Sequence, residues 1–357
     1  EFKGKFAADN GRCLIKDGEL IAYANASGEV YAIPKSVTAI RSEAFEGCSS
    51  LTSITIPDSI TVIGYCTFLG CSSLTSITIP DSVTEIERYA FYNCSSLTSI
   101  TIPNGVTEIG DYAFSDCSSL TSITIPDSVT YIGNGAFRDC SSLTSITIPN
   151  SVTVIGWFAF EGCSSLREFK GKFAADNGRC LIKDGVLIAY ASASGKVYAI
   201  PNGVTKIGVY AFYGCSRLTN VTIPNGVTEI GDSAFEGCSS LTSITIPDSV
   251  TVIGWYAFGG CRSLTNVTIP NGVTEIEGFA FSGCGSLTSV TIPNSVTKIV
   301  TSAFGLCGKL KNVDICNEKG CVDIGYHAFG PDVKVTYLGK DAQPKKKGFF
   351  ARLFGKK

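Results

Sequence analysis

The chain has 357 residues, and its 29 basic side chains nearly balance 31 acidic ones. Six of the basic residues lie in the last 13 positions, so residues 1–344 carry 23 basic against 31 acidic side chains, a net charge of −8. This balance excludes a nucleic-acid-binding body, which requires a basic stripe. No run of 18 apolar residues is present, so we expect no membrane-spanning segment.

Residues 1–40 carry a β-hairpin signal. The segment CLIKDGELIAYA, which begins at Cys13, has two apolar runs around a Lys-Asp-Gly turn, a pattern that predicts two antiparallel strands. Residues 168–207 repeat the whole segment with an offset of 167, so that Cys13 matches Cys180. We therefore expect two hairpin-widened coils in the fold.

The N-terminal hairpin coil differs from its second copy in what precedes it. Residues 164–167 come before the second copy, whereas Glu1 opens the first. A solenoid end without a preceding coil leaves apolar side chains and a strand edge open. One hypothesis is therefore self-association through the N-terminal coil, as a dimer or a head-to-tail filament.

Residues 41–167 and 208–307 repeat with a period of 23 residues. Each repeat carries a phenylalanine, a cysteine and, in most copies, a proline, for example Phe114, Cys117 and Pro126. A fixed period of this length is typical of one small unit stacked on copies of itself, which makes a solenoid. Because stacking uses up the interior, we expect function to lie on the surface.

The repeat that begins at Cys94 indicates how one coil is built. Ile100 and Ile102 alternate with small polar residues, as in a strand with one buried face. Pro103 ends the strand because it has no amide hydrogen to donate. The Ala-Phe pair at 113–114 is then expected to plug the core from a short helical or 3₁₀ turn. Each coil would bury about six apolar side chains, each worth roughly 1.5–3 kcal/mol.

The 16 cysteines raise the question of disulfides. Eleven of them stand at one repeat position, followed by two small or polar residues and an aliphatic one, as in CSSL from Cys117. A small buried hydrophobe behaves in this way in a stacked core, and neighbouring thiols of such a ladder have the wrong dihedral for a bridge. We expect free, buried thiols, which fit a reducing compartment and do not exclude an exported protein.

The repeat has the form LTSITIPDSVTEIGDYAFxxCSS, and it closely resembles that of the BspA-like leucine-rich-repeat proteins over residues 33–163 and 200–307. This resemblance implies a right-handed solenoid, usually on or outside a bacterial or protist cell and often linked to adhesion and host-protein binding. It implies no shared catalytic residues. We predict about 14 coils, arranged as an N-terminal hairpin coil (1–40), a repeat array (41–167), a second hairpin coil (168–207), a second array (208–307), a C-terminal cap (308–340) and a basic aromatic tail (341–357).

Two exposed faces of the array are candidates for binding. The strand face stacks hydroxyls, as at Ser99 and Thr101, which could order water or meet a glycan, or could simply be good exposed strand residues. The edge just before each Ala-Phe pair varies most and is rich in aromatics, which supply rigid contact area. The alternative there is half-buried packing against the next coil. We name these candidates the aromatic turn edge: Tyr89, Tyr112, Trp157, Phe158, Tyr210, Trp255, Tyr256 and Phe279.

The cap contains Cys316 and Cys321 near His327, the only histidine of the chain. A single histidine excludes a His-Asp-Ser set in the repeats and a histidine cluster for metal. The spacing of the two cysteines is not the short Cys-x₂-Cys of zinc sites, which favours cap packing or a local disulfide over a metal site.

The tail departs from the rest of the chain. Its apolar residues fall on one helical face, with Arg352 and lysines opposite. This layout is that of an interfacial helix for anionic lipid or of a partner-docking peptide, and a solvated end is the third alternative. The candidate docking residues are Phe349, Phe350, Arg352, Leu353 and Phe354.

These observations favour a non-enzymatic scaffold that binds or adheres to a protein or glycan ligand. The alternative is a structural protein that self-assembles by end stacking into a filament or surface component. We expect no cofactor, metal site or nucleic-acid partner. The expected location is the cell surface or the outside of the cell, and the cytoplasm is the alternative that free thiols allow.

Overall fold

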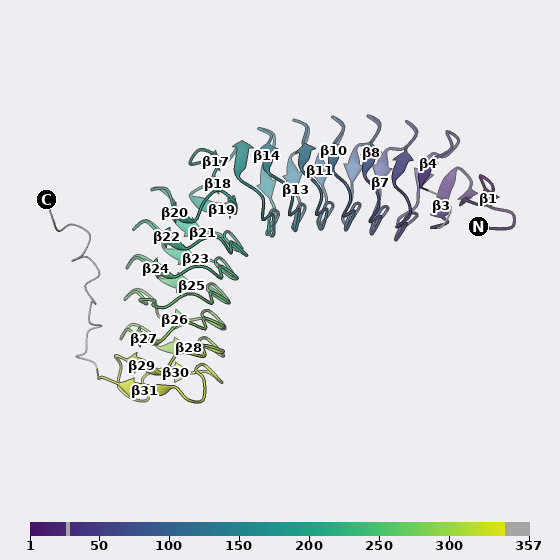
Figure 1. Ribbon diagram of the computed structural model, residues 1–357. Helices are drawn as coiled ribbons and strands as arrows, with labels where there is room; N and C mark the ends of the chain where they lie inside the picture. The colour runs from purple at the N-terminus through teal and green to yellow at the C-terminus, as the bar shows by residue number, and fades with distance from the viewer. Residues whose placement is uncertain (26–28, 340–357) are drawn as a thin grey trace. The chain divides into compact units, whose positions relative to one another are not determined.

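The computed structural model describes residues 1–25 and 29–339. Over these residues the chain is a β-solenoid of about 14 turns with a repeat of ~23 residues, and it contains no helix there (Figure 1). The predicted solenoid is confirmed. The coils form two compact units, one comprising Glu1–Lys196 and Ile207–Arg217, and the other Val197–Lys206 and Leu218–Lys357.

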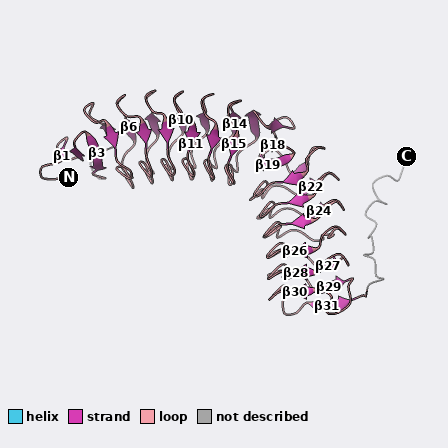
Figure 2. Cartoon of the chain, turned by 180° about the vertical axis from the view of Figure 1, so that it is seen from behind, coloured by secondary structure: helices cyan, strands magenta, loops and turns pink. Residues whose placement is uncertain are grey.

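Within each unit, the coils contribute short strands to two parallel columns, in a register set by the repeat. Ile54, for example, lies opposite Ile77, one repeat later. Figure 2 shows the strands in magenta, linked by pink turns. The first column comprises β4 (Val30–Ala32), β6 (Ser53–Thr55), β8 (Ser76–Thr78), β10 (Ser99–Thr101), β12 (Ser122–Thr124), β14 (Ser145–Ile148), β16 (Glu168–Gly171), β20 (Val197–Ala199), β22 (Asn220–Thr222), β24 (Ser243–Thr245), β27 (Ser289–Ile292), β29 (Asn312–Ile315) and β31 (Lys334–Tyr337).

The second column consists of two-residue strands after the proline turn. They are β5 (Ala39–Ile40), β7 (Val62–Ile63), β9 (Glu85–Ile86), β11 (Glu108–Ile109), β13 (Tyr131–Ile132), β15 (Val154–Ile155), β21 (Lys206–Ile207), β23 (Glu229–Ile230), β25 (Val252–Ile253), β26 (Glu275–Ile276), β28 (Lys298–Ile299) and β30 (Asp323–Ile324). In both columns the apolar residue of the Ser-Ile-Thr or Glu-Ile pattern points inward and the polar residues face solvent, as the alternation predicts.

The two predicted hairpins are present. The first contains β1 (Ala7–Ala8), β2 (Cys13–Lys16) and β3 (Glu19–Tyr23), and the second contains β17 (Ala174–Ala175), β18 (Cys180–Lys183) and β19 (Val186–Tyr190). In each, an antiparallel strand pair is joined by an Asp-Gly turn with both residues at positive φ. Asp17 has φ 51° and Gly18 φ 82°, which is the backbone that a two-residue hairpin turn requires.

Phenylalanine rings form a stacked ladder inside each unit. Phe91, Phe114 and Phe137 are fully buried, and successive ring centroids lie 5.2 and 5.7 Å apart with interplanar angles of 3°. Phe235 and Phe258 repeat this arrangement in the other unit at 5.2 Å. The ladder therefore packs the core closely from one coil to the next.

The segment around Ala-Phe is a series of turns, where the sequence predicts a short helical or 3₁₀ turn. Its amides alternate between two kinds of acceptor. Ala113 and Ser115 donate to carbonyls three residues back, whereas Tyr112 and Phe114 donate to Asn134 and Ala136 of the next coil at 2.8 and 2.9 Å. Left-handed φ angles, such as 56° at Tyr112, break helical continuity and turn alternate amides toward the neighbouring coil.

The cysteine column lies beside this segment, and its side chains are hydrogen-bonded. The thiol of Cys117 donates to the carbonyl oxygen of Phe91 in the preceding coil, with Sγ at 3.2 Å. Fifteen of the sixteen cysteines are buried, all are free thiols, and Cys321 alone is exposed. The prediction of free, buried thiols is thus confirmed. Cys316 and Cys321 are unbridged, so the alternative of a local disulfide is wrong.

Candidate functional site

The aromatic turn edge is held in an unusual backbone conformation. Its residues directly before Ala-Phe have left-handed φ angles between 47° and 60°, as at Phe158 and Tyr210. This conformation costs a non-glycine residue roughly 1–2 kcal/mol, so the side chains there are fixed by the surrounding coils rather than by local preference. Tyr89, Tyr112, Phe158, Tyr210 and Phe279 are half-buried.

In the first unit these aromatics contact one another along the stacking direction. The rings of Tyr89 and Tyr112 are parallel, with centroids 5.1 Å apart. Tyr112 also meets Phe158, two coils further on, at 5.7 Å. Gly135 occupies the coil between them, where an added Cβ would lie 2.7 Å from the Tyr112 ring, so the missing side chain lets the two rings meet. The predicted alternative of packing against neighbouring coils therefore describes part of this edge.

The two tryptophans are the most exposed members of the edge. Trp157 is 67% exposed and Trp255 44% exposed. Their backbones are nevertheless tied down, because the Trp157 amide donates to Asn134 Oδ1 at 2.9 Å and the Trp255 amide to Asp232 Oδ1 at 2.8 Å. Each tryptophan therefore presents a large apolar surface to solvent from a fixed backbone, as residues that dominate interfaces do.

In the second unit, a second aromatic pair lies next to Trp255. Tyr256 and Phe279 stack with centroids 4.6 Å apart and an interplanar angle of 1°, and Tyr256 is 37% exposed. Gly278 leaves room for the Trp255 ring, since an added Cβ would come within 2.5 Å of Cζ3. The edge of this unit thus offers a tryptophan face beside a tyrosine.

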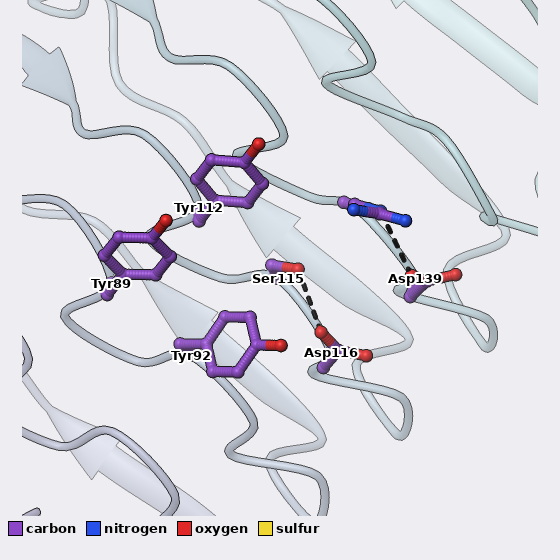
Figure 3. A pocket seen from close by; sticks show the side chains of 7 residues that line it. Tyr89, Tyr92, Tyr112, Ser115, Asp116 and Asp139 are labelled. Atoms are coloured by element: carbon purple, nitrogen blue, oxygen red, sulfur yellow. Dashed lines mark hydrogen bonds and ion pairs between the residues drawn. The ribbon is translucent and has the colours of Figure 1, made fainter. Parts of the chain in front are cut away.

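A polar hollow opens beside the edge in the first unit (Figure 3). Its volume is about 400 Å³. Two of the residues that line it, Tyr89 and Tyr112, are predicted from the sequence as candidates for binding, and the others are not. The lining residues are Tyr89, Tyr92, Tyr112, Ser115, Asp116, Arg138 and Asp139.

Charged groups fix the far wall of the polar hollow. Arg138 forms ion pairs with Glu161 at 3.1 Å and with Asp139 at 3.3 Å, and the Glu161 side chain is only 6% exposed. Ser115, which is fully buried, donates its hydroxyl hydrogen to Asp116 Oδ2 at 3.1 Å. Burial raises the pKa of Asp139, and the neighbouring guanidinium of Arg138 opposes this rise. The wall therefore presents two carboxylates and a guanidinium that is ion-paired with one of them, Asp139.

A sequence signal for the missed residues exists. Two positions after the core phenylalanine, most coils have a glycine at positive φ, as at Gly162 and Gly237. Asn93, Asp116 and Asp139 replace that glycine in three consecutive coils and keep the same left-handed backbone, with φ between 55° and 60°. The residues of the hollow can therefore be recognised in the sequence because they differ from the repeat, and not because of their residue type.

The remaining candidates of the sequence fall elsewhere. Hydroxyls of the strand face, such as Ser76 and Thr78, are exposed as expected. Among the described residues, no group of three or more His, Cys, Asp or Glu could hold a metal ion. Across residues 1–25 and 29–339, no helix has the length and apolar character to cross a membrane. The tail residues Phe349, Phe350, Arg352, Leu353 and Phe354 lie outside the described part of the chain.

A family profile for the BspA type leucine rich repeat region matches residues 21–140, 62–174, 189–310 and 228–338. The chain belongs to this family. Leucine-rich-repeat families of this kind are typically non-catalytic. No curated relative matches the chain.

Solved structures of bacterial proteins share the fold. A leucine rich cell surface protein from Faecalibacterium prausnitzii is 34% identical with a TM-score of 0.77, over 89% of this chain and 97% of that one. A leucine-rich repeat protein from Bacteroides ovatus is 33% identical with a TM-score of 0.56, over 89% and 87%. The pneumococcal vaccine antigen PcpA is 25% identical with a TM-score of 0.73, over 89% and 85%. This BspA-type chain is thus similar to bacterial cell-surface proteins.

Proposed function

We propose that this BspA-type protein is a non-enzymatic binding scaffold that works at the cell surface and holds a protein or glycan partner along its aromatic turn edge. The similarity to a leucine rich cell surface protein supports the location. The tryptophans support the surface, because Trp157 exposes 67% of its area from a hydrogen-bonded backbone. Rigid, exposed aromatics bind partners at low cost in conformational entropy.

A binding assay with tryptophan variants tests this function. The full chain would be applied to surfaces coated with laminin, collagen or mucin and to a printed glycan array. A Trp157→Ala/Trp255→Ala variant is expected to bind about tenfold more weakly or worse, because it removes the largest exposed apolar faces. A Thr78→Ala/Thr245→Ala variant of the strand face serves as the control and should bind like the wild type. Unchanged binding by the tryptophan variant, or no binding to any surface, would contradict the proposal.

A second candidate function, self-assembly through the N-terminal hairpin coil, is favoured by what its internal copy contacts. In that copy, β16 pairs with β14, and Lys172 Nζ donates to the carbonyls of Asn150 and Val152 at 2.9 and 2.6 Å. Lys183 Nζ donates to Thr153 O at 2.6 Å. The matching residues of the first copy, Lys5 and Lys16, are exposed. We infer that the first copy uses this same face to contact a coil of a second chain.

Light scattering over a micromolar concentration series tests assembly. Dimers or larger species are expected, and a Lys5→Glu/Lys16→Glu variant should shift them toward monomers, whereas Lys35→Glu should not. The same series on a chain without residues 345–357 separates any contribution of the tail. Monomers at every concentration would rule out this second function and leave the binding function untouched.

A further inference from the structure

At the polar hollow, three consecutive plain coils of the first unit depart from the repeat. Asp116 and Asp139 stand where most coils have glycine at positive φ, and a non-glycine residue there carries strain of roughly 1–2 kcal/mol. Aspartate adopts this conformation at a lower cost in free energy than most residues do, but the cost for glycine is lower still. Backbone strain retained at the rim of a hollow suggests that the carboxylates serve a contact outside the fold.

Neighbouring coils are shaped around these carboxylates. Gly162, the next residue of the column, has no side chain at the point where Asp139 lies, since an added Cβ would come within 2.0 Å of Asp139 Oδ1. Arg138 is held from behind by the buried carboxylate of Glu161. The guanidinium is therefore fixed in place before any ligand arrives, which reduces the entropy that binding would cost.

The hydrogen-bonding groups of the hollow are mixed in kind. The guanidinium of Arg138 only donates, the carboxylates of Asp116 and Asp139 only accept, and the tyrosine hydroxyls do both. Figure 3 shows the Tyr92 hydroxyl on the side of Ser115 and Asp116, and burial together with Asp116 raises the pKa of Tyr92. Two carboxylates disfavour an anionic ligand, and the guanidinium paired with Asp139 disfavours a simple cation. A ligand with several neutral hydroxyls matches the set, because each hydroxyl can donate to a carboxylate and accept from the guanidinium.

From these contacts we propose that the polar hollow binds a saccharide through a pair of its ring hydroxyls, with Asp116 and Asp139 as acceptors and Arg138 as donor. The volume of about 400 Å³ lies within the range of small-ligand sites, roughly 300–1,000 Å³. The parallel rings of Tyr89 and Tyr112 form the adjoining wall. This inference rests on the proposed binding function and assigns it a ligand class and a site.

The test restores the glycine of the repeat. Asp116→Gly/Asp139→Gly removes both acceptors and should fold at least as well, because glycine suits the left-handed backbone. Leu306→Gly makes the same change at the same repeat position of the other unit, where φ is 56°, and serves as the matched control. The probes are a printed glycan array, followed by titration calorimetry of the full chain with the free disaccharide of the strongest spot.

The proposal predicts saccharide binding by the wild type and by Leu306→Gly, and at least tenfold weaker binding by Asp116→Gly/Asp139→Gly. Equal binding by all three would overturn the site while leaving a glycan-binding function in place. Absence of wild-type binding to every glycan would overturn the saccharide class, and the laminin, collagen and mucin surfaces then decide the broader function separately. Binding of an oligolysine peptide instead, lost in the aspartate variant, would also overturn the proposal in favour of a basic protein partner.

Discussion

At the scale of single residues, the cysteine of each repeat shows which properties the fold requires at one buried position. The cysteine of each coil is small enough for the stacked core and also donates a hydrogen bond, as Cys117 does to Phe91 at 3.2 Å. An alanine would fill less space and donate nothing, and a serine would be a stronger hydrogen-bonding group but a poorer apolar one. The cysteine column therefore fills the core and also donates hydrogen bonds to buried carbonyl oxygens.

The reactivity of these thiols follows from their burial. Burial raises the pKa of Cys117 and of Cys163 from 9.0 to about 12, so these two thiols hold almost no thiolate at pH 8.5 in the native protein. With iodoacetamide at that pH, mass spectrometry should find Cys321 modified in the native protein and the buried thiols modified only after unfolding. Rapid native labelling of Cys117 would contradict this burial.

The same thiols predict how stability depends on pH. Their folded pKa values lie above the unfolded value of 9.0, so the folded state holds more protons between pH 9 and about 12. Their stabilising contribution is complete below pH 9 and is lost as the pH rises through the folded pKa. We expect Tm to fall steadily from pH 9 to 11, measured by circular dichroism. The control is a substitution at the exposed thiol, Cys321→Ser, which should leave the slope unchanged.

Gly135 gives a second residue-scale prediction. Its φ is +57°, and an added Cβ would lie 2.7 Å from the ring of Tyr112. Gly135→Ala should lower the free energy of unfolding by about 1–3 kcal/mol through backbone strain and overpacking. Gly308→Ala is the control, because nothing lies within 4 Å of an added Cβ there. Urea unfolding compares the two, and equal stability would show that the Tyr112–Phe158 contact can move aside.

At the scale of elements, the ladder of phenylalanines and the two strand columns carry the fold. Phe114 is fully buried and stacks on rings on both sides, at 5.2 and 5.7 Å. Its removal leaves a cavity that the flanking coils cannot close without breaking their register. The neighbouring turns resist such a movement, since their amides alternate between local acceptors and the next coil.

Truncation of one ring therefore has a large expected effect. Phe114→Ala should lower the free energy of unfolding by about 3–5 kcal/mol. Trp157→Ala is the matched aromatic control, because its side chain is 67% exposed, and it should change stability by about 0.5 kcal/mol or less. Chemical unfolding followed by fluorescence and circular dichroism measures both. A small loss for Phe114→Ala would mean that the coils repack independently of the ladder.

Periodicity alone predicts most elements but little of the candidate site. Alternation at Ile100 and Ile102 locates a strand, and the Asp-Gly turn after Lys16 locates a hairpin, because these patterns depend on neighbouring residues. Asp116 and Asp139 come together only because stacking superimposes positions 23 residues apart. Their exposure and their distance from Arg138 depend on that three-dimensional register. Asp116 and Asp139 could have been recognised from the sequence by comparing, in every coil, the residue at the position where the repeat has glycine.

At the scale of the whole molecule, coils are interchangeable units with nearest-neighbour contacts. Deletion of residues 118–140 removes one complete repeat and rejoins Cys117 to a serine in register. The shortened chain should keep its circular dichroism spectrum and remain monodisperse, with a lower Tm because one coil interface is lost. Deletion of residues 118–129 removes half a repeat and should abolish cooperative unfolding. Similar behaviour of the two deletions would show that register does not control the fold.

The alternating amides of the turn segment also determine how the protein resists mechanical load. Backbone hydrogen bonds from Tyr112 and Phe114 run from one coil to the next, along the stacking direction. A pull on the two ends therefore loads a few bonds at a time, and coils should peel off singly at low force. Each coil that opens frees 23 residues, or roughly 75–80 Å of extended chain. The solenoid would then act as an extensible tether that lengthens in equal steps and shortens again as coils restack.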